Sequence, residues 1–186
     1  MKNTQPPTDN SQDQDATQHG HELFMAEAIK EAQKAATLME VPVGAVVVLN
    51  GEIIGRGFNQ PISSHDPCAH AEIMALRDAA KRIENYRLVD ADLYVTIEPC
   101  TMCSGAIVHA RIKRVVFAAL EPKAGVVCSQ MEAFKQPYFN HEVEVVSGVL
   151  EEQSIKIMQD FFKMRRAQKK QLKKEAREAL LKGGEE

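Results

Sequence analysis

Two short apolar runs, residues 43–49 and 53–58, lie on either side of Asn50-Gly51. Both runs are rich in β-branched residues, which favour strands. Asn-Gly is the pair most favourable to a two-residue type I′ turn, because both central positions of that turn need a positive φ. The sequence therefore predicts an antiparallel β-hairpin at this point of the chain.

Helical and strand patterns alternate around this hairpin. Apolar residues at a spacing of three or four predict helices over 21–38, about 68–84, 101–111 and from 155 onwards. Apolar runs predict further strands at 93–97, 115–119 and 143–146. An irregular loop at 59–67 and a Pro- and Gly-containing connection at 120–140, with one short helix around 129–134, complete the pattern. This order predicts an α/β sheet with helices on both faces.

Composition is typical of a globular protein and excludes several classes. The 186 residues are 44% hydrophobic and 26% charged. The longest apolar stretch, 44–49, is far shorter than the roughly 20 residues of a membrane helix. The N-terminal segment has neither the apolar core nor the arginines of a targeting sequence. Four cysteines are too few for a disulfide scaffold, so we expect a cytoplasmic, reducing environment without membrane association.

The two ends of the chain differ from its middle. Residues 1–19 contain no large apolar residue after the first, and we expect them to be a disordered tail. Residues 163–182 carry nine basic and two acidic residues, a net charge of +7, whereas the rest of the chain carries −10. Such a segment is either a phosphate-binding surface or a solvated helix face. We expect the main domain over 20–170, and over 171–186 a solvated, charged helical extension or frayed tail.

His70 and the Cys-x-x-Cys pair Cys100 and Cys103 predict a metal site. The two cysteines are three residues apart at a predicted helix start, so their sulfur atoms point to the same side of the helix. The N–H groups of the first helical turn also stabilise thiolates. Two thiolates and one neutral imidazole balance the charge of a zinc ion and leave a fourth position open for water, as in catalytic zinc sites. Water bound in this way has a pKa of about 7.

Glu72 is the expected proton carrier, because a carboxylate beside the metal that is not a ligand can accept a proton from the bound water and pass it on. In a regular helix, residues two apart project about 200° from each other, so His70 and Glu72 converge only where a helix opens. Pro67 favours a helix start in this region.

Other interpretations of the cysteines stay open. Cys-x-x-Cys also occurs in redox pairs and in closed structural zinc sites, where Cys68 or Cys128 would supply a fourth ligand. Cys68 would need a distorted loop to reach the metal, and Cys128 is typical of a small buried apolar residue. The site therefore belongs either to an enzyme or to a non-catalytic, zinc-stabilised RNA-binding module.

The sequence resembles the zinc-dependent cytidine deaminase superfamily and, within it, the bacterial tRNA adenosine deaminases. The resemblance covers about residues 21–170 and includes the His-x-Glu and Pro-Cys-x-x-Cys signatures. Further matching segments are 41–45, 59–62, 65–67, 69–76, 85–88, 93–103, 105–106, 111–112 and 114–117. Two positions depart from the family pattern: Cys68 replaces a Thr and Glu121 replaces an Asp.

The resemblance implies a three-layer α/β/α cytidine-deaminase-like fold with a central mixed sheet of about five strands. It implies one zinc ion per subunit, held by His70, Cys100 and Cys103, with Glu72 as the proton shuttle. The residues implied to bind the substrate are Asn59, Val43, Ala71 and His109. The residues implied to contact RNA are Phe162, Arg165, Arg166 and Lys123.

The implied activity is hydrolytic deamination of adenosine to inosine at the wobble position of a tRNA anticodon, in an arginine tRNA. A zinc-bound hydroxide would attack C6 of an adenine that has left its stack, while Glu72 transfers protons. The family also implies a homodimer that binds the anticodon stem-loop. The alternative enzyme is a deaminase of a free base or nucleotide, of guanine or cytosine type. The basic C-terminal segment favours RNA, since a small substrate needs no cationic approach surface.

Overall fold

The computed structural model describes the backbone of residues 11–182 and the side chains of residues 19–178. Its strands are β1 (Gly44–Leu49), β2 (Glu52–Phe58), β3 (Asp92–Ile97), β4 (Arg114–Ala119) and β5 (Glu144–Ser147). Its helices are α1 (Ser11–Thr37), α2 (Pro61–Ser64), α3 (Ala71–Arg82), α4 (Thr101–His109) and α5 (Glu151–Lys182), with a 3₁₀ turn at Ala133–Lys135.

The five strands form one mixed sheet in the order β2-β1-β3-β4-β5. β1 pairs antiparallel with both β2 and β3, whereas β3, β4 and β5 run parallel. Asn50 and Gly51 form the turn between β1 and β2 with φ angles of 52° and 78°, as a type I′ turn requires. The predicted hairpin is therefore confirmed.

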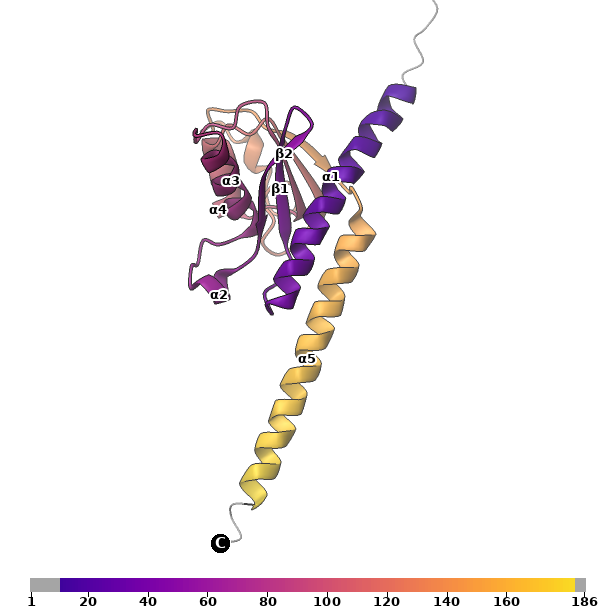
Figure 1. The fold of residues 1–186 in the computed structure, drawn as a ribbon, viewed down its shortest axis with the longest axis vertical. Helices are drawn as coiled ribbons and strands as arrows, with labels where there is room; N and C mark the ends of the chain where they lie inside the picture. The colour runs from indigo at the N-terminus through magenta and orange to yellow at the C-terminus, as the bar shows by residue number, and fades with distance from the viewer. Residues whose placement is uncertain (1–10, 183–186) are drawn as a thin grey trace, which may run out of the picture.

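Helices cover both faces of the sheet, which confirms the predicted three-layer arrangement (Figure 1). α3 and α4 lie on one face, and α1 and α5 lie on the other. The apolar core under α3 includes Val47, Ala75 and Leu93, and the core under α1 includes Ala28 and Tyr94. Alternate residues of each central strand enter the two cores, because successive side chains of a strand point to opposite faces.

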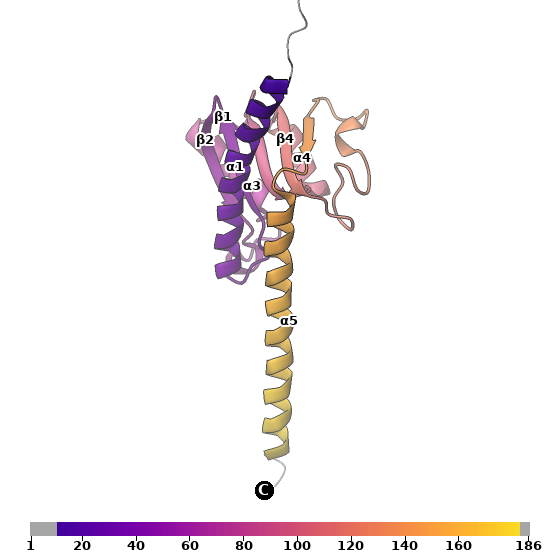
Figure 2. The same cartoon turned by 90° about the vertical axis from the view of Figure 1, so that its right-hand side faces the viewer.

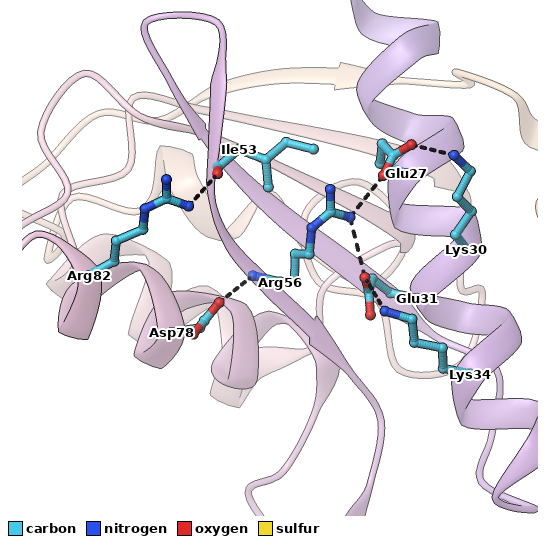
Figure 3. A network of polar contacts seen from close by, with 8 residues as sticks. All are labelled: Glu27, Lys30, Glu31, Lys34, Ile53, Arg56, Asp78 and Arg82. Carbon is cyan, nitrogen blue, oxygen red and sulfur yellow. Dashed lines mark hydrogen bonds and ion pairs between the residues drawn. The ribbon is translucent and has the colours of Figure 1, made fainter.

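The edge strand β2 is tied to a helix on each side through Arg56 (Figure 3). Its guanidinium contacts Glu27 at 2.9 Å and Glu31 at 3.3 Å on α1, while its backbone N–H donates to Asp78 on α3 at 2.9 Å. Charged groups on an edge strand also oppose pairing with other chains. The network therefore joins the outer layers at the free edge of the sheet.

Several boundaries differ from the sequence-based predictions. α1 begins at Ser11, inside the predicted disordered tail, because a helix anchored by its apolar part propagates through polar residues at little cost; residues 1–10 of that tail lie outside the described part. α2 occupies part of the predicted irregular loop. α3 begins at Ala71 rather than near Cys68. None of the described helices has the length and apolar character of a membrane span.

Candidate metal centre and active site

The candidate site lies at the edge of the sheet where β2 and β3 end and α3 and α4 begin. His70 is the N-cap of α3 and Cys100 is the N-cap of α4, and both have extended backbones, with ψ values of 154° and 175°. His70 therefore stands just outside its helix and Glu72 just inside it. In a regular helix these two side chains would project about 200° from each other. Because His70 is extended and only Glu72 follows helical geometry, both side chains can face the same site.

The side chains of His70, Cys100 and Cys103 converge, with their ligand atoms all within 4.8 Å of one another. The Nδ1 atom of His70 lies 3.7 Å from Sγ of Cys100 and 3.6 Å from Sγ of Cys103. Tetrahedral zinc with bonds of about 2.3 Å to sulfur and about 2.05 Å to nitrogen requires S···N separations of about 3.6 Å. The three residues therefore fit a zinc ion and leave a fourth position free for a non-protein ligand.

The charges of these groups also suit a cation. Hydrogen bonds from Cys103 and His70 lower the pKa of the Cys100 thiol to about 4, despite its burial. The bond with Cys100 and burial raise the pKa of Cys103, so the pair shares one thiol proton. The Cys100 sulfur raises the pKa of His70. A bound divalent cation removes these protons, since metal ligands are thiolates and neutral imidazoles.

Glu72 lies next to this cluster and is only 3% exposed. Burial raises the pKa of its carboxyl, and the Cys100 sulfur raises it further, while His70 opposes the shift. A carboxyl whose pKa moves towards neutrality can both accept and release a proton during turnover. Glu72 therefore has the environment of a general acid and base.

A pocket of about 210 Å³ opens in front of these groups. Its lining includes the predicted residues Val43, Asn59, His70, Glu72, Cys100 and Phe162. Asn59 follows β2, and its side-chain Oδ1 accepts a hydrogen bond from the N–H of Ala71 at 2.9 Å. Ala71 itself is fully buried and is not part of the lining, so it acts on the pocket through Asn59.

Glu98 is a pocket residue that the sequence reasoning missed. It is 2% exposed, and its carboxylate accepts hydrogen bonds from the N–H groups of Glu121, Cys128 and Ser129 and from the Ser129 hydroxyl. Burial alone would raise the pKa of Glu98, but these bonds hold it below its usual range. An acidic residue directly after the apolar strand 93–97 was the available signal.

Other predicted residues lie further from the metal ligands. His109 is exposed at the end of α4 and lines two different pockets with Tyr86. Lys123 is exposed in the loop between Glu121 and Ala124, which both line the site pocket. Arg165 and Arg166 are exposed on α5, one turn beyond Phe162. The structure thus brings Phe162 to the pocket, whereas Lys123, Arg165 and Arg166 are exposed and do not line it.

Neither remaining cysteine joins the metal ligands. Within the described residues, the cluster capable of holding a metal contains His70, Cys100 and Cys103 without Cys68. Cys68 is exposed in a separate groove beside α3 and α4. Cys128 is also exposed, so its predicted burial is wrong: its N–H donates to the buried Glu98, and its side chain faces outward.

Comparisons with known proteins agree with this site. Residues 18–119 match the model of the cytidine and deoxycytidylate deaminase zinc-binding region. The chain is 51% identical over 150 residues to a tRNA-specific adenosine deaminase of Haemophilus influenzae, covering 80% of this chain and 87% of that protein. It is 48% identical over 153 residues to the tRNA-specific adenosine deaminase of Bacillus subtilis, covering 82% and 95%.

A solved structure from a study of tRNA:A34 deaminases and A-to-I editing superposes with a TM-score of 0.71 at 46% identity. It covers 72% of this chain and 97% of the solved one. The aligned region of the relatives thus spans nearly their whole length. Together with the metal ligands and Glu72, the match shows that the chain belongs to the zinc-binding cytidine and deoxycytidylate deaminase family.

Proposed function

We propose that this protein is a zinc-dependent tRNA adenosine deaminase that converts the wobble adenosine of an anticodon to inosine. The observation that carries this proposal is the buried Glu72 beside the ligands His70, Cys100 and Cys103, in a chain that aligns along 80% of its length with a tRNA-specific adenosine deaminase. A structural zinc site has no use for an unliganded buried carboxylate. The combination therefore favours a catalyst over a zinc-stabilised binding module.

The reaction adds water at C6 of adenine and releases ammonia, leaving inosine. His70, Cys100 and Cys103 would hold the zinc ion, which when bound would supply a water molecule with a pKa of about 7. Glu72 accepts the proton that this water loses and delivers it to N1 of the purine. The same carboxylate then takes the proton of the new hydroxyl group on C6 and passes it to the departing amine. Ammonia leaves, the C6 oxygen becomes the carbonyl of inosine, and Glu72 returns to its starting state.

Asn59 positions the base. Its Oδ1 is occupied by the Ala71 N–H, which leaves both amide N–H donors for acceptor atoms of a purine. Val43 and Ile97 give the pocket apolar walls for the faces of the ring. At about 210 Å³ the pocket is smaller than the roughly 300–1,000 Å³ of sites for drug-sized ligands, and it suits one extruded base.

The surroundings of the pocket favour a loop in RNA over a free base. Phe162 lines the pocket and is 43% exposed, so its ring is available for stacking on a neighbouring base. Lys123, Arg165 and Arg166 provide positive charge for the phosphates that flank the extruded nucleotide. An anticodon stem-loop of an arginine tRNA in the cytoplasm is the substrate that we expect from the family.

We further propose a homodimer that uses the face formed by α3 and α4. An apolar groove of about 400 Å³ lies there, and Tyr86, Met102, Ala106 and His109 line it. A second copy would bury this surface and place His109 at the interface. Light scattering should give twice the chain mass, and Tyr86→Asp should reduce the mass to that of one chain.

The experiment that tests the activity uses the zinc-quantified full chain on an arginine tRNA anticodon stem-loop. Free adenosine, guanine and cytidine are assayed in parallel, with ammonia release and inosine content as the readouts. Inosine at the wobble position alone supports the proposal. Turnover of a free base alone would assign the chemistry to a small substrate, and bound zinc without turnover would favour the binding module.

A further inference from the structure

The outer part of α5 stands away from the rest of the protein (Figures 1 and 2). The helix leaves the body at the end of the sheet where the pocket lies, and from Arg165 to Glu178 every side chain is exposed. The sequence predicts for residues 171–186 a solvated, charged helical extension or a frayed tail. As far as Lys182 these residues are helical, and they continue the helix that contributes Met158 and Phe162 to the pocket.

Charge is distributed unevenly around this outer helix. With about 100° between successive residues, all eight basic side chains from 163 to 177 project within one half of the helix circumference. The direction midway across that half falls between Phe162 and Arg166. The eight residues are Lys163, Arg165, Arg166, Lys169, Lys170, Lys173, Lys174 and Arg177, and we call them the basic face of α5.

The opposite half of the helix carries no positive charge between 163 and 178. It holds only neutral and acidic residues: Met164, Ala167, Gln168, Gln171, Leu172, Glu175 and Glu178. Lys174 lies 3.8 Å from Glu178, and it is the one member of the basic face with a carboxylate within 4 Å among the described side chains. A helix that is merely exposed to solvent typically carries positive and negative side chains all around its circumference. The separation of the two charges on α5 therefore indicates a surface that binds an anion.

The basic face is aligned with the pocket. Met158 and Phe162 are one turn apart on the side of α5 that lines the pocket, and the same side continues outward through Arg166 and Lys169. At 1.5 Å per residue, the helix carries positive charge for about 22 Å from Phe162 to Arg177. The rest of the chain is acidic, with 24 acidic and 14 basic residues outside 163–182, so the arm is where phosphates are attracted.

We propose that the basic face of α5 is an RNA-binding arm that lies along the phosphate backbone of the stem adjoining the loop held at the pocket. This inference rests on the proposed function for the identity of the RNA. A row of cations that starts beside the pocket and runs outward along the helix can contact successive phosphates of one strand. The contacts would be independent of sequence, because the deep, narrow major groove of an RNA stem keeps its base edges out of reach and leaves the phosphates accessible.

The test compares two variants of the full chain with the same change in net charge. The arm variant is Lys169→Gln, Lys173→Gln and Arg177→Gln, and the control variant is Ala167→Glu, Gln168→Glu and Gln171→Glu on the opposite half. Both sets keep good helix formers, and circular dichroism checks that the helix content is unchanged. Binding is measured by fluorescence anisotropy with a full-stem anticodon hairpin and with a hairpin cut back to its closing base pairs.

We expect the arm variant to raise Kd for the full-stem hairpin about tenfold and to reduce the magnitude of the slope of log K against log salt by about two to three. The control variant should change Kd much less, and the cut-back hairpin should bind wild type and arm variant alike. The kcat at saturating RNA should stay at the wild-type value in the arm variant, because the pocket is untouched.

Equal effects of the two variants on the full-stem hairpin would overturn the arm, as would an arm variant that binds like wild type. Binding of the wild type and the arm variant to phosphatidylserine vesicles is measured as well. If the arm variant loses vesicle binding but binds RNA like the wild type, the proposal is overturned and the basic face of α5 is assigned to a membrane. If the wild-type protein deaminates no RNA, the proposed function fails, and the anisotropy comparison still decides the arm. If it deaminates the hairpin while all variants bind alike, the arm alone fails.

Discussion

The side-chain Oδ1 of Asn59 accepts a hydrogen bond from the N–H of Ala71 at 2.9 Å, so a pocket residue is fixed to the segment that carries both His70 and Glu72. The N–H groups of the first helical turn have no partner within their own helix. Asn59 satisfies one of them and is held in place by it. The lining of the pocket and the start of α3 are therefore coupled.

Replacing Asn59 separates these two roles. Asn59→Ala should lower kcat/KM by roughly 10- to 100-fold, because a part-buried hydrogen bond and the donors to the base are both lost. Asn59→Asp keeps an acceptor for the Ala71 N–H, so it should lose activity without losing melting temperature. Steady-state kinetics and thermal unfolding check this. Equal loss of melting temperature in both variants would reduce Asn59 to a structural residue.

Glu72→Gln should lower kcat by about 10²- to 10⁴-fold, the usual contribution of a general acid and base. The variant keeps the size of the buried side chain, so zinc content measured by mass spectrometry should match that of the wild type. Zinc loss in Glu72→Gln would instead make this residue a metal ligand.

Cys100→Ser should lose zinc and melting temperature together, because metal binding free energy contributes to folding when the ligands come from distant segments. Cys68→Ser is the matched control. Its thiol is exposed in a separate groove, so zinc content, melting temperature and activity should all be retained. Zinc loss in the control would restore the site with four protein ligands.

Glu98 is expected to hold in place the loop 121–129, which pairs with Cys100 through Gly125. Glu98→Ala leaves buried N–H groups without an acceptor and should lower the free energy of unfolding by about 3 kcal/mol. Gly125→Ala should also destabilise, since its Cβ would lie 2.4 Å from the Glu98 carboxylate. Gly105→Ala, whose Cβ would meet nothing within 4 Å, should instead stabilise α4 by about 0.5–1 kcal/mol. The free energies of unfolding measured in urea should lie below the wild-type value for Glu98→Ala and Gly125→Ala and above it for Gly105→Ala.

His21 predicts a dependence of stability on pH. Burial and the charge of Arg114 lower its pKa from 6.5, and its Nδ1 lies 2.9 Å from the hydroxyl of the buried Tyr94. The imidazole of His21 therefore binds a proton more readily in the unfolded chain than in the folded one. Its contribution to the free energy of unfolding is fully present above pH 6.5 and is lost as the pH falls below that value. Melting temperatures between pH 7.5 and 5.5 should fall less in His21→Gln than in wild type. The exposed His19→Gln should follow the wild type.

The parts of the fold with a local signal could be predicted from the sequence. The Asn50-Gly51 turn and the strand 93–97 depend on nearest neighbours, and both lie within a residue or two of where they were expected. The four-residue helix α2 has no such signal. It depends on Glu40, a buried residue from another segment, which accepts the Ser63 N–H at 2.6 Å.

The residues that carry the chemistry of the site could be predicted from the sequence, whereas the residues that hold the surrounding loop could not. Spacing and residue type were enough to propose the ligands His70, Cys100 and Cys103, because metal coordination restricts both. The position of Glu98 directly after strand 93–97 marks it as unusual, but its role could not be predicted, since its partners belong to the connection 120–140, which has no periodic pattern. The basic face of α5 was visible as a charge run, but its alignment with Phe162 needed a continuous helix.

The turn at Asn50-Gly51 closes the β1–β2 hairpin at the end opposite to Val43 and Asn59, which flank its open end beside the pocket. A Cβ at Gly51 would meet nothing within 4 Å. Exposed loop tips of this kind tolerate inserted sequence. A fluorescent label or a fused domain placed there would report on the protein, or carry it to a chosen location, without approaching the pocket or the basic face of α5.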